Sequence, residues 1–435
     1  MNTVAEVKLW GSTIGAVAIE DGATTASFEY DRAFAQSGIQ LSPLTMPLTD
    51  CVYTFPALSP TSFHGLPGLL ADSLPGRFGN ALIDAWLASQ GRTPESFNAV
   101  ERLCYTGTRG MGALEFFPAT GPQPRRSTRL HVDRLVALAS EILRHRHDLR
   151  TSFADEKKAN ALRDILRVGT SAGGARAKAV IAWHPDTNDV RSGQIKASPG
   201  FEYWLLKFDG VSGNKDKELD DPQGYGAIEL AYHRMARDCG ITMSECRLFE
   251  KGGRRHFMTR RFDRLPDGDK LHMQSLAAMA HLDFNQAGAH SYEQALQVVR
   301  RLGLPTTTVE KLFRRMVFNI IARNQDDHVK NIAFLMDRSG NWSLAPAFDV
   351  LYSYQPDGDW TSSHQMTVNG KRDGFALTDF EACAEAASLK RRQPKAILAD
   401  VGKVVSRWRE YADEAGVSPT QRDKIQNALC LEPIS

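Results

Sequence analysis

The chain has 435 residues, 42% of them hydrophobic and 24% charged, and its 53 basic and 51 acidic side chains leave a formal charge of +2. Such a composition is typical of a folded globular protein of two or three domains, and it argues against a strongly basic nucleic-acid-binding chain. The sequence has no apolar stretch of about 20 residues, no signal-peptide-like opening and no cysteine spacing typical of zinc sites, so we expect a cytoplasmic protein without a membrane partner.

The first third of the chain predicts a β-rich unit followed by helices. A strand-like apolar run occupies residues 7–19, and apolar residues at helical spacing follow at 82–87 and 97–104. The stretch 118–126, PATGPQPRR, is rich in residues that interrupt regular structure. We therefore predict an N-terminal subdomain over residues 1–117 that ends at this linker.

Small and basic residues alternate in a candidate phosphate loop after the linker. Small side chains let backbone N–H groups approach an anion, and arginine and lysine add positive charge. The spacing matches neither the P-loop nor the kinase glycine-rich pattern, and a Gly-Gly pair is more often an ordinary turn. The candidate ATP-binding residues of this loop are Ser171, Ala172, Gly173, Gly174, Ala175, Arg176 and Lys178.

A lysine lies on the apolar face of the next predicted strand, residues 201–209. Alternation places Lys207 on one face with two apolar residues, and a buried ammonium needs an anionic partner such as an ATP phosphate. The alternative is an edge position with the ammonium in water. Glu229, on a predicted helix over 227–239, is a possible partner for Lys207, although the helix macrodipole explains an acid in a first turn equally well.

The chain then predicts a nucleotide-contacting linker and a helical lobe. Phe262 follows a strand-like run and is positioned to stack on adenine, with core packing as the alternative. From about residue 306 the pattern becomes mainly helical. We predict one lobe over residues 127–305, with the phosphate loop and the lysine, and a helical lobe over 306–435.

Residues 324–349 contain three polar side chains at the spacing that the active site of a phosphoryl-transfer enzyme requires. Asp326 and Asn331 have the five-residue separation of the kinase catalytic loop, which favours Asp326 over Asp327. Two apolar runs joined by a turn predict a hairpin that returns Asp349 to Asn331. Asp326 would orient the acceptor hydroxyl, while Asn331 and Asp349 would bind Mg²⁺ on ATP. The alternative is a solvated polar loop.

The segment 63–79, FHGLPGLLADSLPGRFG, is similar to the GLP and DSLP signature of the HipA toxin kinases of bacterial type II toxin–antitoxin systems, and the resemblance covers nearly the whole chain. It implies an α+β fold, in which a small β-rich N-terminal subdomain precedes a protein-kinase-like, two-lobed domain with a mainly helical C-terminal lobe. The roles that the resemblance implies are autophosphorylation of Ser171 or the adjacent Thr170, ATP binding by Lys207, catalysis by Asp326 with His328 and Lys330, and magnesium binding by Asn331 and Asp349.

The resemblance also implies an ATP- and Mg²⁺-dependent serine/threonine kinase that phosphorylates an aminoacyl-tRNA synthetase and blocks translation. Its expected partner is a HipB-like DNA-binding antitoxin, through which it reaches operator DNA. The chain departs from the family pattern at Arg260, where an acid is common, and in its GGARAK loop. Two alternatives stay open: a small-molecule kinase of the aminoglycoside or lipid type, and an ATP-binding scaffold that acts through the antitoxin.

Overall fold

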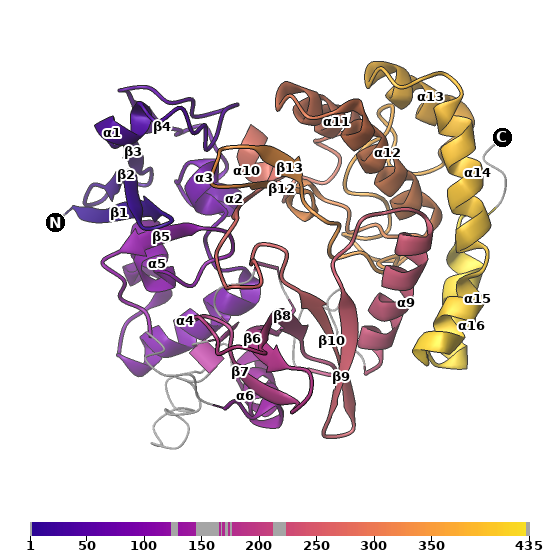
Figure 1. Cartoon of the computed structure of the whole chain (residues 1–435), viewed down its shortest axis with the longest axis horizontal. Coiled ribbons are helices and arrows are strands. Elements are labelled where there is room, and N and C mark those ends of the chain that lie inside the picture. The colour runs from indigo at the N-terminus through magenta and orange to yellow at the C-terminus, as the bar shows by residue number, and fades with distance from the viewer. Residues whose placement is uncertain are drawn as a thin grey trace.

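The computed structural model describes residues 2–122, 129–144, 165–166, 168–169, 173–174, 176–211 and 223–431. In these residues the chain forms a β-rich N-terminal unit, a second unit built on a five-stranded sheet, and a helical unit (Figure 1). Thr170, Ser171, Ala172 and Ala175 lie outside the described residues. No described helix has the length and hydropathy that crossing a membrane requires.

The N-terminal unit is an antiparallel sheet with the strand order β4-β3-β2-β1-β5. The strand-like run predicted at 7–19 is a hairpin, in which β1 pairs with β2 around Trp10 and Gly11, both at positive φ. Alternating buried residues on β1 and β2 face a core that the short helices and α5 cover. Its elements are β1 Thr3–Leu9, β2 Ser12–Ile19, β3 Ser27–Tyr30, α1 Arg32–Ala35, β4 Val52–Thr54, α2 Pro60–Phe63, α3 Gly68–Ala71, α5 Ala99–Thr106 and β5 Leu114–Phe117.

The second unit is an antiparallel sheet with the order β7-β6-β8-β10-β9, so β8 is an inner strand. Helices α4 and α6 share a core with this sheet, although both precede β6 in the chain, and α9 packs against β9 and β10. Its elements are α4 Arg77–Ser89, η1 Pro94–Ser96, α6 Val132–Arg144, β6 Lys178–His184, β7 Asp189–Ser192, β8 Glu202–Lys207, α9 Tyr225–Asp238, β9 Cys246–Lys251 and β10 Arg254–Arg260.

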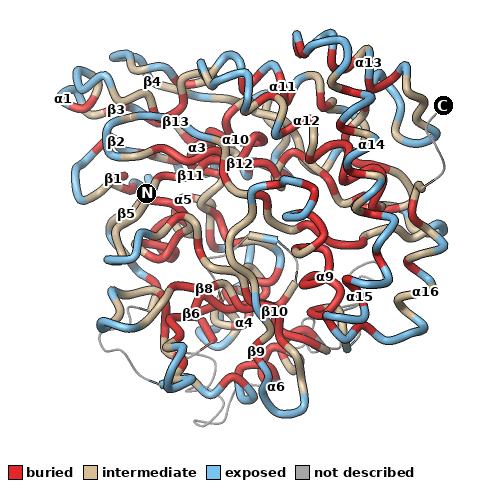
Figure 2. The backbone as a smooth tube through the Cα atoms, turned by 45° about the vertical axis from the view of Figure 1, so that its right-hand side comes forward, coloured by how far each residue is buried: buried red, intermediate tan, exposed pale blue. Residues whose placement is uncertain are grey.

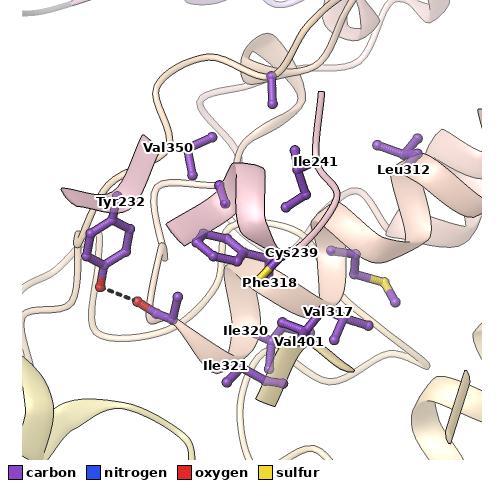
Figure 3. Packing of buried hydrophobic residues seen from close by; sticks show 14 of the residues in the cluster. Tyr232, Cys239, Ile241, Leu312, Val317, Phe318, Ile320, Ile321, Val350 and Val401 are labelled. Carbon is purple, nitrogen blue, oxygen red and sulfur yellow. Dashed lines mark hydrogen bonds between the residues drawn. The ribbon is translucent and has the colours of Figure 1, made fainter. Parts of the chain in front are cut away.

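The third unit combines helices with a small antiparallel sheet of order β11-β12-β13. Its core also takes in α9, whose Tyr232 hydroxyl donates to the carbonyl of Ala322 at 2.6 Å (Figure 3). Its elements are β11 His272–Ser275, α10 Leu276–Ala280, α11 Tyr292–Arg301, α12 Thr306–Ile321, η3 Val329–Asn331, β12 Ala333–Met336, β13 Trp342–Leu344, α13 Leu377–Ala386, α14 Gln393–Val405, α15 Trp408–Ala415 and α16 Pro419–Ala428.

This architecture confirms the predicted fold class, a β-rich subdomain followed by a two-lobed, kinase-like body with a mainly helical second lobe. The predicted hairpin is present as β12 and β13, and the helix predicted at 227–239 is α9. Figure 2 shows α9 buried along most of its length between the two lobes, whereas α16 carries mostly exposed and half-buried residues. The buried α9 therefore connects the cores on which the candidate site rests.

Candidate functional site

The polar loop 324–331 follows α12 and is fastened to the returning hairpin by one buried arginine. Arg315 of α12 donates to the carbonyl oxygens of Asn331 at 2.5 Å and of Phe348 at 3.3 Å. Asn331 in turn donates from Nδ2 to the carbonyl of Asp326 at 2.8 Å. The hairpin thus brings Asp349 to Asn331, as its spacing predicted, and Arg315 holds the two segments together.

The two adjacent aspartates of this loop have different environments. Asp327 is buried and accepts hydrogen bonds from Tyr292 Oη at 2.8 Å, His364 Nδ1 at 2.9 Å and the backbone N–H of Gln365 at 2.8 Å. Burial alone would raise the pKa of Asp327, but His364 and these donors hold it below its ordinary value. Asp327 is therefore an ionised structural group whose acceptor capacity is largely used.

Asp326 keeps a third of its side chain exposed and is oriented by a residue from a distant loop. The indole N–H of Trp360 donates to Asp326 Oδ1 at 2.7 Å, and His328 Nε2 lies 3.8 Å from the same oxygen. The other carboxylate oxygen points to no hydrogen-bond donor among the described residues. Asp326, rather than Asp327, is thus available to accept a proton from a substrate hydroxyl.

Lys207 lies between two carboxylates at the centre of the site. Its Nζ is 2.5 Å from Glu229 Oε1 on α9, and it also donates to Asp349 Oδ1. The predicted pair with Glu229 is confirmed, and the alternative of an edge lysine with its ammonium in water is wrong, because β8 is an inner strand and Lys207 is 7% exposed. Asp349 adopts a φ of 50°, a strained conformation of the kind that clusters at functional sites.

The ionisable side chains around Lys207 shift one another's pKa values. Burial alone would lower the pKa of Lys207, but the carboxylates of Asp349 and Glu229 outweigh burial and raise it. Burial would likewise raise the pKa of Asp349, but Lys207 and Lys178 hold it below its ordinary range. Lys178 lies directly opposite Lys207 across β6 and β8, and burial lowers its pKa to about 8.

The described part of the phosphate loop folds back onto this cluster. Lys178 Nζ donates to the carbonyl of Gly173 at 2.6 Å, and Gly174 has a φ of 92°, which favours glycine. The guanidinium of Arg176 is 4.0 Å from Glu229 Oε2. Three cations thus lie around the carboxylates of Glu229 and Asp349, namely Lys178, Lys207 and Arg176, and such a group of cations suits a phosphate ligand.

Phe262 packs beside the hairpin. Its ring centroid is 5.7 Å from that of Phe348, and both rings contact a small cluster that contains Ala333 and Leu335. The core-packing alternative for Phe262 is therefore present in this structure, and adenine stacking stays a prediction. Arg260 lies within 4 Å of two carboxylates on neighbouring segments, at Glu202 and Glu245, so its charge is balanced by surface ion pairs.

Lys330 and His328 flank an aromatic residue that the sequence did not single out. Lys330 Nζ lies 4.7 Å from the ring centroid of Phe284, and the His328 ring is 6.1 Å from it. Phe284 and Trp360 occupy irregular segments, where no periodic pattern marks a residue. Arg315 left no such signal either, because it stands beside Arg314 on the side of the predicted helix that faces away from the apolar positions.

The 63–79 signature segment fastens the N-terminal unit to the helical lobe. Asp72 accepts hydrogen bonds from the backbone N–H of Ser275 at 2.6 Å and from its hydroxyl at 2.8 Å, at the start of α10. The backbone N–H of Gly68 donates to His281 Nε2 at 3.1 Å. The segment therefore lies beside α10, which in turn packs on η3 of the polar loop.

The oxygen donors of Asn331 and Asp349 fit a magnesium ion. Asn331 uses Nδ2 and Asp349 uses Oδ1 in the side-chain hydrogen bonds that the described residues make, which leaves Oδ1 of Asn331 and Oδ2 of Asp349 for a cation. Magnesium prefers carboxylate and carbonyl oxygens and retains several waters, so two protein ligands beside a phosphate are sufficient. These two side chains would hold the ion next to Lys207.

Comparison with known proteins gives the family. Residues 5–117 match the HipA N-terminal domain and residues 170–408 match the HipA-like C-terminal domain. Two Sinorhizobium fredii proteins named as kinases, Y4mE and Y4dM, are 26% and 25% identical over 206 and 220 residues, which is 45% and 46% of this chain. The alignments span 42% and 52% of those relatives, so the chain spans about half the length of the curated relatives that it matches.

A solved structure shares the fold across the whole chain. It is the HipA toxin–antitoxin complex of Shewanella oneidensis MR-1, containing HipA, HipB and operator DNA, and it matches with a TM-score of 0.67 and 16% identity. The match covers 98% of this chain and 96% of that one. With more than half of its residues matched to the HipA-like C-terminal domain, this chain belongs to the HipA family.

Proposed function

We propose that this protein is an ATP- and Mg²⁺-dependent serine/threonine protein kinase of the toxin type. The observation that carries the proposal is Lys207 bridging Glu229 on α9 and Asp349 after the hairpin. In protein kinases a strand lysine pairs with a helix glutamate, and an aspartate that binds magnesium completes the site. Here Lys207 on β8, Glu229 on α9 and Asp349 after β13 would fill these three roles.

The site divides the chemistry between its two sides. Asp326, held by Trp360, would accept the proton of a serine or threonine hydroxyl as it attacks the γ-phosphate. Lys207, Lys178 and Arg176 would bind the phosphates, with Lys330 near the transferred group. Magnesium, held by Asn331 and Asp349, would neutralise phosphate charge when bound.

Membership of the HipA family supports a proposal about partners. The similar fold of the Shewanella HipA in a complex with HipB and operator DNA supports a HipB-like antitoxin as the partner here, with operator DNA reached through it. We propose an aminoacyl-tRNA synthetase as the substrate, so that phosphorylation stops translation. We also propose autophosphorylation at Ser171, where a phosphate would add about −1.5 to −2 charges to the phosphate loop and oppose the binding of ATP.

A phosphotransfer assay tests the proposal. Purified protein is incubated with labelled ATP, Mg²⁺ and a panel of aminoacyl-tRNA synthetases with their tRNAs, and phosphosites are mapped by mass spectrometry. The Asp326→Asn variant should lose the label, and Asp357→Asn, an exposed aspartate near Trp360, is the matched control. Label on one synthetase and on Ser171 is the expected result. Nucleotide binding without label on any protein would instead favour a small-molecule kinase or a scaffold.

A further inference from the structure

The turn at Pro75 and Gly76 touches the phosphate loop backbone to backbone, across almost 100 residues of sequence. A Cβ at Gly76 would overlap the backbone nitrogen and oxygen of Gly174 and lie 2.8 Å from the carbonyl carbon of Gly173. Gly76 has φ −70° and ψ −174°, a conformation that any residue adopts. Closeness to the loop, and not backbone conformation, is what requires glycine at this position.

The turn is itself held rigidly. Asn80 Nδ2 donates to the carbonyl of Pro75 at 2.9 Å, and Arg102 donates to Asn80 Oδ1 at 2.9 Å. Arg102 also pairs with Asp84 at 3.2 Å, and all four groups are at least partly buried. On the other side, Asp72 ties the segment to the start of α10 through Ser275. A displacement of the loop toward the turn therefore meets a fixed surface.

Helix α4, which begins directly after Gly76, packs against the chain on both sides of the loop. Phe78 and Leu82 of α4 share a core with Ile165 before the loop and with Ala177 after it. A Cβ at Gly169 would lie 2.7 Å from Leu82 Cδ1, so this approach is also close. The loop is thus supported at its ends by α4 and at its glycines by the turn.

We propose that the Pro75–Gly76 turn is a seat that holds Gly173 and Gly174 of the phosphate loop in the position that receives ATP, which makes Gly76 a positioning residue outside the nucleotide site. This inference rests on the proposed kinase function. While the loop is seated, the Gly173 carbonyl binds Lys178 and keeps its ammonium beside Lys207. Pushing the loop off the seat separates Gly173 from Lys178 and disperses the cationic cluster.

The test is the Gly76→Ala variant, which adds one methyl group. The matched control is Gly402→Ala in α14, where a Cβ would meet no atom within 4 Å. Two properties are measured: the Kd for a non-hydrolysable ATP analogue with Mg²⁺, and hydrogen exchange of residues 173–178 without nucleotide. We expect Gly76→Ala to weaken analogue binding about tenfold or more, as a displaced binding loop would, and to speed exchange in the loop. Gly402→Ala should change neither.

A second variant covers the case in which Gly76→Ala folds poorly. Asn80→Ala removes the bond to the Pro75 carbonyl without adding an atom near the loop, so it should loosen the seat and produce a smaller change of the same sign. If both variants fold and neither changes the affinity for the ATP analogue or the hydrogen exchange of the loop, the proposed role of the turn is wrong. If the wild type binds no nucleotide while the variants still speed loop exchange, the kinase proposal fails and the seat itself stands.

Discussion

The two sides of the candidate site are held in place by different forces. On the acid-loop side, Arg315 and Asn331 donate to backbone carbonyls, so the geometry is set by hydrogen bonds that need no ligand. On the phosphate side, Lys207 is held by the charges of Glu229 and Asp349. We infer that the acid loop is preformed, whereas under the proposed function the phosphate side would have to rearrange its ion pairs for a nucleotide to bind Lys207 and for magnesium to bind Asp349.

The largest expected effect comes from removing the lysine of the charge-paired side. Lys207→Met leaves Glu229 buried without its partner, and breaking a buried pair costs about 3–5 kcal/mol of folding free energy. Urea unfolding should show this loss, and analogue binding should fall below detection. The double variant Lys207→Met/Glu229→Gln should regain most of the stability but none of the binding. Equal stability of the single and double variants would show that the pair is not what holds this side.

The matching test on the hydrogen-bonded side is Arg315→Met. Two half-buried carbonyls lose their donor, and a carbonyl left without a partner costs about 1–3 kcal/mol when it is fully buried, so we expect a loss of about 2–4 kcal/mol in unfolding free energy and a marked fall in phosphotransfer. Arg234→Met in α9 is the control, because Arg234 pairs with the largely exposed Glu414 and such pairs contribute about 0–1 kcal/mol. Equal losses in the two variants would contradict the bridging role.

The same contrast shows which parts of the site were predictable. The separation of Asp326 and Asn331 is read directly from the sequence, and the hairpin before Asp349 follows from two apolar runs joined by a turn. For Glu229 the sequence left two explanations open, and the structure shows the pair with Lys207. Contacts between distant segments leave no such pattern. Gly76 meets Gly174, and Trp360 meets Asp326, only once the chain has folded. Before packing, a glycine or a tryptophan in an irregular segment is compatible with many different surroundings, so neither contact was predictable.

Replacing Trp360 tests whether the indole N–H orients the carboxylate of Asp326 on the acid-loop side. Trp360→Phe keeps an aromatic ring but removes the N–H that binds Asp326 Oδ1. If orientation is the role, kcat should fall about tenfold, which corresponds to about 1.4 kcal/mol, while KM for ATP stays unchanged. Steady-state kinetics at saturating acceptor measures both. A rise in KM for ATP with unchanged kcat would place Trp360 in nucleotide binding instead.

The smallest expected effect is a pH dependence on the phosphate side of the site. Burial lowers the pKa of Lys178 to about 8, whereas the pKa of a lysine in an unfolded chain is about 10.4. Between these two pH values the unfolded chain therefore binds more protons at this lysine than the folded chain does. The contribution of Lys178 to stability therefore rises with pH across this window. Phosphates favour the charged ammonium, so binding of the ATP analogue should take up a proton and weaken a few-fold as pH rises above about 8.

Calorimetry in two buffers of different ionisation enthalpy measures how many protons are taken up on binding. Lys178→Met should abolish this uptake, whereas the control Lys251→Met, on the exposed end of β9, should keep it. Proton uptake that survives in Lys178→Met would mean that Lys178 is not the group that adjusts its charge to the nucleotide.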